Sequence, residues 1–181
     1  MPINTVISTK ISDTGSEPIT VEQAKLHAAI DYPDYDSIIP IYISAARIAI
    51  ENATGLALIE KTVKQVVQLY PNTLFKLSYS PVKTFNYGYE LGIDECGQYI
   101  VSSSGQPVNY GANDEVIVVS KAGIYEIEYK AGYATVPADL KLAILQMFTF
   151  IFNHRGEYND GRLDISVEAE RTIMNNKRFV I

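Results

Sequence analysis

The two histidines of the chain are the residues best suited to acid–base or metal chemistry. His154 and Glu157 are three positions apart, a spacing that on a helix can direct a ring nitrogen and a carboxylate toward one metal ion. Gly156 interrupts this helical spacing, and His27 is the only other histidine, whereas a zinc site needs three or four ligands. We therefore expect no metal site, and we interpret His154 as part of a polar cluster near the negative end of a helix dipole.

The other potential nucleophiles have unfavourable surroundings. Cys96 is the only cysteine, and the neighbouring Asp94 and Glu95 disfavour the thiolate that nucleophilic attack requires. The serines at 102–104 lack the Gly-x-Ser-x-Gly elbow of an esterase. A small hydrolase remains as an enzymatic hypothesis, but the sequence predicts no catalytic residue and no cofactor.

Composition excludes several classes of protein. With 181 residues, of which 47% are hydrophobic, the chain can bury a core as a single domain. Its net charge of −6 argues against tight nucleic-acid binding, because that affinity comes from a concentrated basic surface. The start of the chain has no secretory pattern, and the apolar stretch Leu140–Phe152 is too short to span a bilayer, so we expect no membrane partner.

Local signals predict helices at both ends of the chain. Thr20 and Gln23 have the spacing of a capping box, Gly55 can end a second helix in a left-handed conformation, and Pro137 suits the first position of a third. Ser166 can cap a fourth helix. The expected helices span about 21–30, 37–54, 137–154 and 167–175.

The middle of the chain has the period of strands. From Glu60 to Leu69 apolar and polar residues alternate, and further short strand-like pieces follow, separated by turns. We therefore predict an α+β fold, a small helical bundle with an antiparallel β-rich insertion at about 60–130. Residues 1–16 are expected to form an N-terminal arm, in which Ile3–Ile7 could pair as a short strand, and residues 176–181 a C-terminal arm.

Tyrosine is unusually abundant. The chain has 13 tyrosines and no tryptophan, and most of the tyrosines lie in the strand-rich region. Tyrosine suits half-buried strands and also wet contact surfaces. Ordinary sheet packing explains the pattern, and the alternative function is a β module that binds carbohydrate or a host surface.

The third expected helix is apolar on nearly every side. Leu140, Ala143 and Ile144 begin one stripe, yet other large apolar residues lie away from it. Such a helix is either central to the fold or shared with another subunit. Together with the basic and apolar C-terminal arm, it supplies the candidate contact residues Leu142, Leu145, Phe150, Phe152, Lys177, Arg178 and Phe179.

An ordered set of motifs resembles the phage head-tail connector family of tailed bacteriophages and prophages. The segment Glu17–His27, an Asp-rich loop and Ile43–Gly55 are similar to the opening of that family. Ile127–Tyr133 and Val136–Leu145, closing on Asn153–Arg155, are similar to its later half. The similarity spans about 17–157, is weaker in the middle, and is poor from Ile165 onward.

This resemblance implies a structural role without catalysis. It implies a ring of identical copies, formed alone or only on the portal, that joins the portal to the tail and extends the DNA channel. It also implies a tail-side adaptor or stopper as a partner, DNA that passes through without tight binding, and a place in the virion after assembly in the bacterial host cytoplasm.

Overall fold

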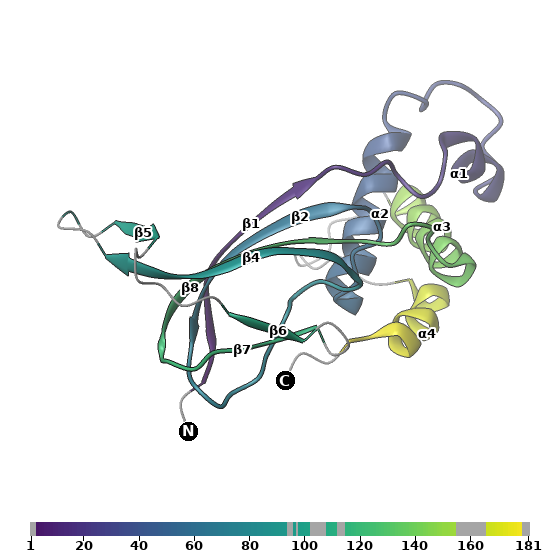
Figure 1. Ribbon diagram of the computed structural model, residues 1–181. Coiled ribbons are helices and arrows are strands. Elements are labelled where there is room, and N and C mark those ends of the chain that lie inside the picture. The colour runs from purple at the N-terminus through teal and green to yellow at the C-terminus, as the bar shows by residue number, and fades with distance from the viewer. Residues whose placement is uncertain are drawn as a thin grey trace. The chain divides into compact units, whose positions relative to one another are not determined.

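The computed structural model describes residues 3–93, 96, 98–101, 108–111, 115–154 and 166–178, and it has an α+β fold, as predicted. The chain divides into two compact units. Among the described residues, those up to Thr14 and those of Glu60–Gly132 form the sheet unit, and those of Gly15–Ile59 and of 133–178 form the helical unit. Figure 1 follows the chain through both units from the N-terminus to the C-terminus.

Four helices are present among the described residues, and all four were expected from the sequence. They are α1 (Val21–His27), α2 (Ile39–Thr54), α3 (Ala138–Asn153) and α4 (Val167–Asn176). The capping box at the start of α1 is confirmed, because the Thr20 hydroxyl accepts the Gln23 amide at 3.2 Å and the Gln23 side chain accepts the Thr20 amide at 3.0 Å. The stop at Gly55 is also confirmed, with φ of 74°.

Three helix details differ from expectation. α1 ends at His27 instead of Ile30, because the chain turns through a positive φ of 53° at Ala29. Pro137 is the N-cap of α3, one position before the helix. The Ser166 hydroxyl does not cap α4, because it donates a hydrogen bond to the Glu168 carboxylate at 2.6 Å.

α2 and α3 form the centre of the helical unit. Their facing sides are apolar, and Ile43, Ile50, Ile144 and Phe148 are buried among them. Burial of each large side chain contributes roughly 1.5 to 3 kcal/mol before the entropy cost. α1 and α4 add Ala24, Ala169 and Ile173 to the same core, which fixes both short helices against α2 and α3.

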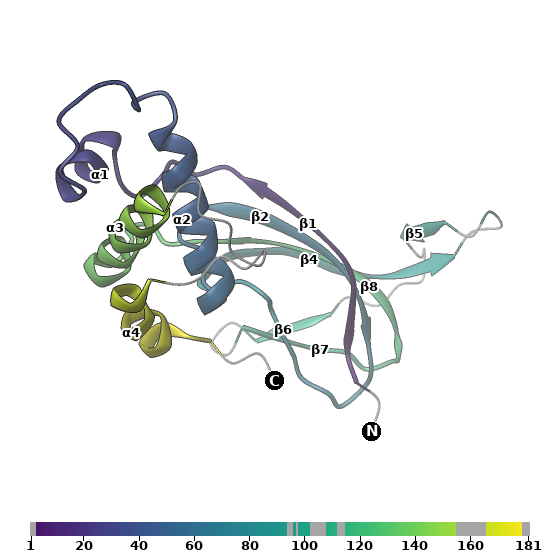
Figure 2. The same ribbon diagram turned by 180° about the vertical axis from the view of Figure 1, so that it is seen from behind.

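The sheet unit contains two antiparallel sheets among the described residues. The larger has the order β1-β2-β8-β4-β5 and the smaller the order β3-β7-β6. Their bounds are β1 Thr5–Asp13, β2 Lys61–Leu69, β3 Phe75–Lys76, β4 Val82–Ile93, β5 Tyr99–Val101, β6 Asn109–Gly111, β7 Val116–Val118 and β8 Gly123–Ala131. Figures 1 and 2 show β1, β2, β8 and β4 side by side.

The N-terminal segment is a strand where an extended arm was expected. β1 pairs with β2 from Thr5 to Asp13, with an irregularity between Val6 and Ser8. Its nine residues are all exposed, because the strand lies at the edge of the sheet. The first of the short strand-like pieces expected after Leu69 is brief, since Phe75 and Lys76 are the residues of β3 that pair.

Candidate interaction surfaces

The outer side of α3 is mostly polar, with Leu142 as its large exposed apolar residue and Asp139 exposed one turn before it. Leu142, Gln146, Thr149 and Asn153 recur at intervals of four, three and four residues, and so lie along one face of the helix. This face, called here the outer α3 face, lies opposite the buried stripe that begins with Leu140. Leu142 is 47% exposed.

The candidate contact residues on α3 have three different environments. Leu142 is exposed, whereas Leu145 and Phe150 are half-buried against the core. Phe152 is only 3% exposed, and its ring meets the Tyr35 and Tyr42 rings edge to face at centroid distances of 5.4 and 5.8 Å. Phe152 is therefore a core residue in this chain, not a surface residue as the helix pattern suggested.

The C-terminal candidates also differ from one another. Lys177 is exposed, whereas the Arg178 amide donates a hydrogen bond of 2.8 Å to the carbonyl of Thr54 at the end of α2. This bond holds the start of the expected arm against the helical unit. Phe179 lies outside the described residues.

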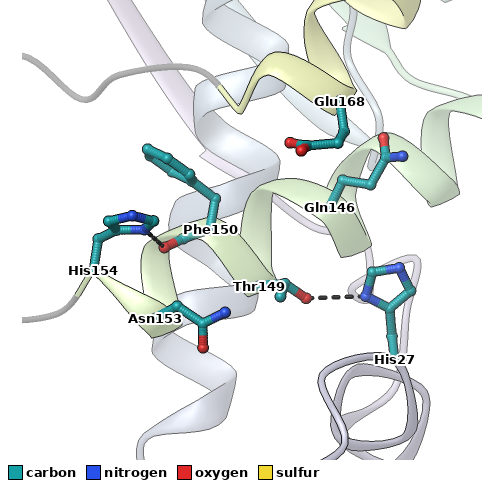
Figure 3. A pocket seen from close by; sticks show the side chains of 7 residues that line it. All are labelled: His27, Gln146, Thr149, Phe150, Asn153, His154 and Glu168. Atoms are coloured by element: carbon teal, nitrogen blue, oxygen red, sulfur yellow. Dashed lines mark hydrogen bonds between the residues drawn. The ribbon is translucent and has the colours of Figure 1, made fainter.

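A small pocket lies on the outer α3 face between α1 and α4. Its volume is about 230 Å³, and α3 supplies most of its lining. His27 comes from α1 and Glu168 from the first turn of α4 (Figure 3). The lining residues are His27, Gln146, Thr149, Phe150, Asn153, His154 and Glu168.

Hydrogen bonds fix the proton on one nitrogen of each histidine. The Thr149 hydroxyl donates to the Leu145 carbonyl at 3.0 Å, so it accepts from His27 Nδ1 at 2.9 Å. His154 Nδ1 lies 2.8 Å from the Phe150 carbonyl, which can only accept (Figure 3). Each neutral histidine therefore carries its proton on Nδ1 and has Nε2 as its acceptor.

The chemistry of this pocket is hydrogen bonding. Its lining combines two histidines, two amides and a carboxylate, without a cysteine or serine. The hydrogen bond from Ser166 lowers the pKa of Glu168, so this carboxylate stays ionised. Among the described residues, no group of three or more His, Cys, Asp or Glu side chains could hold a metal ion.

Of the residues that were considered for chemistry, the two histidines line the pocket. His154 lies at the end of α3, as expected, and Glu157 is outside the described residues. Cys96 is exposed in a turn of the sheet unit. The serines at 102–104 are outside the part of the chain that the structure describes.

The sheet unit has its tyrosines in two kinds of environment. Tyr125 and Tyr129 are fully buried, as ordinary sheet packing predicts. On the opposite face Tyr87 stacks on Tyr89 at a centroid distance of 5.5 Å. The Tyr87 hydroxyl lies 3.2 Å from a Glu126 oxygen and 3.1 Å from a Glu128 oxygen, and burial raises its pKa.

An uncharged helix face on α2 was missed in the sequence. On α2, Ile41, Ala45, Ile48 and Asn52 have the same four, three and four spacing, and Ile38 precedes them. Ile41 is 65% exposed and Ile48 44% exposed. The signal was present in the sequence, because these isoleucines lie off the buried stripe of α2, as Leu142 lies off that of α3.

Comparisons with known proteins agree with this architecture. A family model described as head completion protein matches residues 17–163. No curated protein matches the sequence. No described helix is both long and apolar enough to cross a membrane.

Three solved structures share the fold. One, titled as the neck of an empty GTA particle computed with C6 symmetry, has a TM-score of 0.66 at 18% identity and covers 95% of this chain and 97% of that chain. Another, titled as the virion of a native gene transfer agent particle, has a TM-score of 0.62 at 20% identity and covers 94% and 96%. The third, titled as the neck of a native GTA particle computed with C12 symmetry, has a TM-score of 0.58 at 19% identity and covers 95% and 97%.

Proposed function

The chain belongs to the head completion protein family, and from this premise we propose that its copies form a ring that joins the portal of a phage capsid to the tail. The family match confirms the resemblance drawn from the sequence motifs, and it gives the chain a structural role as a head-tail connector. In the proposal, the ring extends the DNA channel, meets a tail-side adaptor or stopper, and becomes part of the virion after assembly in the host cytoplasm.

The observation that carries the ring proposal is the outer α3 face. A ring member must present apolar surface to its neighbours, and Leu142 does so from a helix whose other side lies in the core. Leu145 and Phe150 lie beside it, half-buried, and a neighbouring copy would complete their burial. Lys177 is an exposed basic residue that could extend the contact.

Two further features agree with a role without catalysis. In the pocket on this face, the Thr149 hydroxyl donates its proton to the Leu145 carbonyl and accepts from His27, so neither histidine acts on it as a general base. A net charge of −6 suits a channel protein that DNA passes without tight binding, because the chain as a whole repels phosphates.

Substitution of Leu142 by Asp tests the proposal. In a phage or prophage that encodes this chain, L142D should lower the yield of tailed particles roughly tenfold or more, because the contact would bury an unpaired carboxylate. Electron microscopy should show DNA-filled heads without tails. The matched control is Leu74→Asp, which changes an exposed leucine of the sheet unit and should leave the yield unchanged.

Purified L142D should melt at the same temperature as the unsubstituted chain, since Leu142 is not part of the core. Normal yields of tailed particles from a stably folded L142D chain would contradict the proposed contact.

A further inference from the structure

We propose that the pocket between α1, α3 and α4 binds the guanidinium group of an arginine side chain that a different protein presents. The inference goes beyond the proposed ring, because it concerns a partner other than a copy of this chain and a site that the ring contact at Leu142 does not use.

The lining of the pocket is rich in hydrogen-bond acceptors. Glu168 supplies a carboxylate, and His27 and His154 in their neutral form each leave Nε2 as an acceptor, because Nδ1 carries the proton. The amide oxygens of Gln146 and Asn153 can accept as well. Among the residues that the structure describes, no lysine or arginine lines the pocket. A ligand that matches this lining donates several hydrogen bonds and carries a positive charge.

The helix ends around the pocket leave its negative charge in place. Phe150 and Asn153 belong to the last turn of α3, a helix of 16 residues, whose C-terminal carbonyl groups act as about half a negative elementary charge. The first turn of α4 contributes a partial positive charge of similar size, so these two nearly cancel. Glu168 then adds a full negative charge. The pocket as a whole therefore favours a cation.

One wall of the pocket is aromatic. The ring centroids of Phe150 and His154 lie 4.4 Å apart, with 34° between the ring planes. In Figure 3 the Phe150 ring and the Glu168 carboxylate lie on the same side of α3. A guanidinium group is planar, so it can stack on an aromatic ring while its N–H groups bond a carboxylate. An ammonium group has no flat face and only three donors, so a lysine side chain matches this wall less well.

A hydrogen bond orients the Glu168 carboxylate before a ligand binds. The Ser166 hydroxyl donates to Glu168 Oε2 at 2.6 Å, and Ser166 is itself completely buried. The donor is therefore fixed by the fold, although Glu168 lies at the surface. An acceptor that is already oriented loses less conformational entropy on binding, which favours recognition of a group with a defined shape.

The size of the pocket indicates a single side chain. Its volume of about 230 Å³ is below the range of about 300 to 1,000 Å³ that is usual for small-molecule sites. Asn153, His154 and Glu168 are exposed, so the pocket is accessible from solvent. The chain carries a net charge of −6, which favours a basic partner. These properties suit an arginine on the surface of another protein.

The histidines make binding at this site directly observable. His27 and His154 are the only histidines of the chain, so their ring protons in an NMR spectrum report on the pocket alone. The probe is N-acetyl-L-arginine N-methylamide, called here capped arginine, which has no charge besides its guanidinium group. Added to the purified full chain, it should shift both ring signals with a dissociation constant on the order of 1 mM. The capped lysine of the same design should bind roughly fivefold or more weakly.

Two variants with the same change in charge separate the pocket from general attraction. Glu168→Gln should weaken the binding of capped arginine roughly tenfold, because the charge-assisted hydrogen bonds are lost. Glu170→Gln removes an exposed carboxylate of the same helix that does not line the pocket, and it should leave the affinity unchanged. Phe150→Leu should weaken binding roughly threefold, because it removes the aromatic ring. Thermal melting should show that each variant is folded.

Four results of these titrations would overturn the inference. The first is the absence of any shift of the histidine signals. Equal affinities for capped arginine and capped lysine would exclude recognition of a guanidinium group. Equal losses in E168Q and E170Q would reduce the effect to the overall charge of the chain. Tighter binding of free L-arginine than of capped arginine would assign the pocket to a small molecule instead of a protein side chain.

The partner is tested in a phage or prophage that encodes this chain. Glu168→Arg should lower the yield of tailed particles, because it places a cation where the arginine of the partner binds, whereas Glu170→Arg should not. Normal yields from a folded E168R chain would overturn the assignment to a protein partner. Arg171 is an exposed arginine on α4. Self-association of the purified chain that is lost in both E168Q and Arg171→Ala would place a second copy in the pocket and would also overturn it. The NMR titrations need no ring, so failure of the proposed function would leave their outcome unchanged.

Discussion

Arg47 and Glu51, one turn apart on α2, form an ion pair in which each side chain is 3% exposed. Glu17 accepts from the same guanidinium at 3.0 and 3.1 Å, and the second oxygen of Glu51 accepts the Leu58 amide at 2.7 Å. The pair therefore connects the segment before α1, the helix α2 and the segment after it. A buried charge is tolerated here because its hydrogen bonds are made inside the protein.

Substitution of Glu51 by Leu should destabilise the chain by about 3 kcal/mol, because it removes a buried carboxylate partner of the buried Arg47 guanidinium. It also removes the acceptor of the Leu58 amide. Chemical denaturation would measure the loss. Glu51→Gln keeps an acceptor and should lose less. Equal losses for both variants would show that the charge of Glu51 is unimportant.

Phe152 and Phe150 should respond differently to truncation. Phe152→Ala should cost about 3 to 5 kcal/mol, because it empties a buried site between Tyr35 and Tyr42. Phe150→Ala should cost clearly less in the isolated chain, since Phe150 is half-buried. The free energies of unfolding of the two variants give the comparison. A larger loss for F150A would contradict the assignment of Phe152 to the core.

Gly88 in β4 should not accept a side chain. A Cβ atom at this position would lie 2.4 Å from Val108 Cγ2, so Gly88→Ala should destabilise the sheet unit by about 1 to 3 kcal/mol. The double variant G88A/V108A should recover part of this loss, because the second change removes Val108 Cγ2, the methyl group that clashes with the new Cβ atom. Denaturation of the single and double variants tests the coupling. Strictly additive losses would mean that the two residues do not clash.

Stability should fall in alkaline solution. Burial raises the pKa of Tyr87 above its ordinary value of 10.0, and the hydrogen bond that Lys64 donates to Glu126 raises the pKa of Lys64 above 10.5. A group with a raised pKa in the folded state contributes stability that is complete below its unfolded pKa and is lost as the pH rises through its folded pKa. The loss should therefore begin above about pH 10.

Tyr87→Phe should reduce this pH dependence, because the variant has no phenol to ionise. The free energy of unfolding, measured at pH 8 and again above pH 10, gives the slope for each protein. The same alkaline slope in Y87F and in the unsubstituted chain would assign the loss to other groups.

Local signals predicted much of the fold. The Thr20 capping box and the glycine at 55 act through backbone geometry within a few residues, so the sequence alone is sufficient. The predicted end of α1 was wrong because the chain turns at Ala29, which adopts a positive φ although alanine has no special preference for it. β1 was not expected at its full length because an exposed edge strand has no buried face, and thus no apolar alternation to detect.

The contact surfaces were predictable only in part. The number of apolar residues in α3 indicated that another subunit could contact this helix. The sequence did not show, however, that Leu142 is exposed whereas Phe152 is buried. Both lie off the main stripe, and tertiary packing against Tyr35 and Tyr42 decides that Phe152 is buried. The spacing of the α2 isoleucines could be read from the sequence, whereas the burial of Arg47 with Glu51 is visible only in the folded chain.

The pairing of β1 with β2 interleaves the two units along the chain. In the sequence, α1 and α2 both lie between Asp13 of β1 and its partner Lys61 of β2. The two strands can therefore pair only when the ends of this long segment come together, which costs entropy. Packing of α1 on α2 makes the segment compact and so reduces that cost. Neither unit is therefore a contiguous gene fragment. A fragment that begins at Glu60 would lack β1 and expose the edge of β2, whose free backbone groups would then template aggregation.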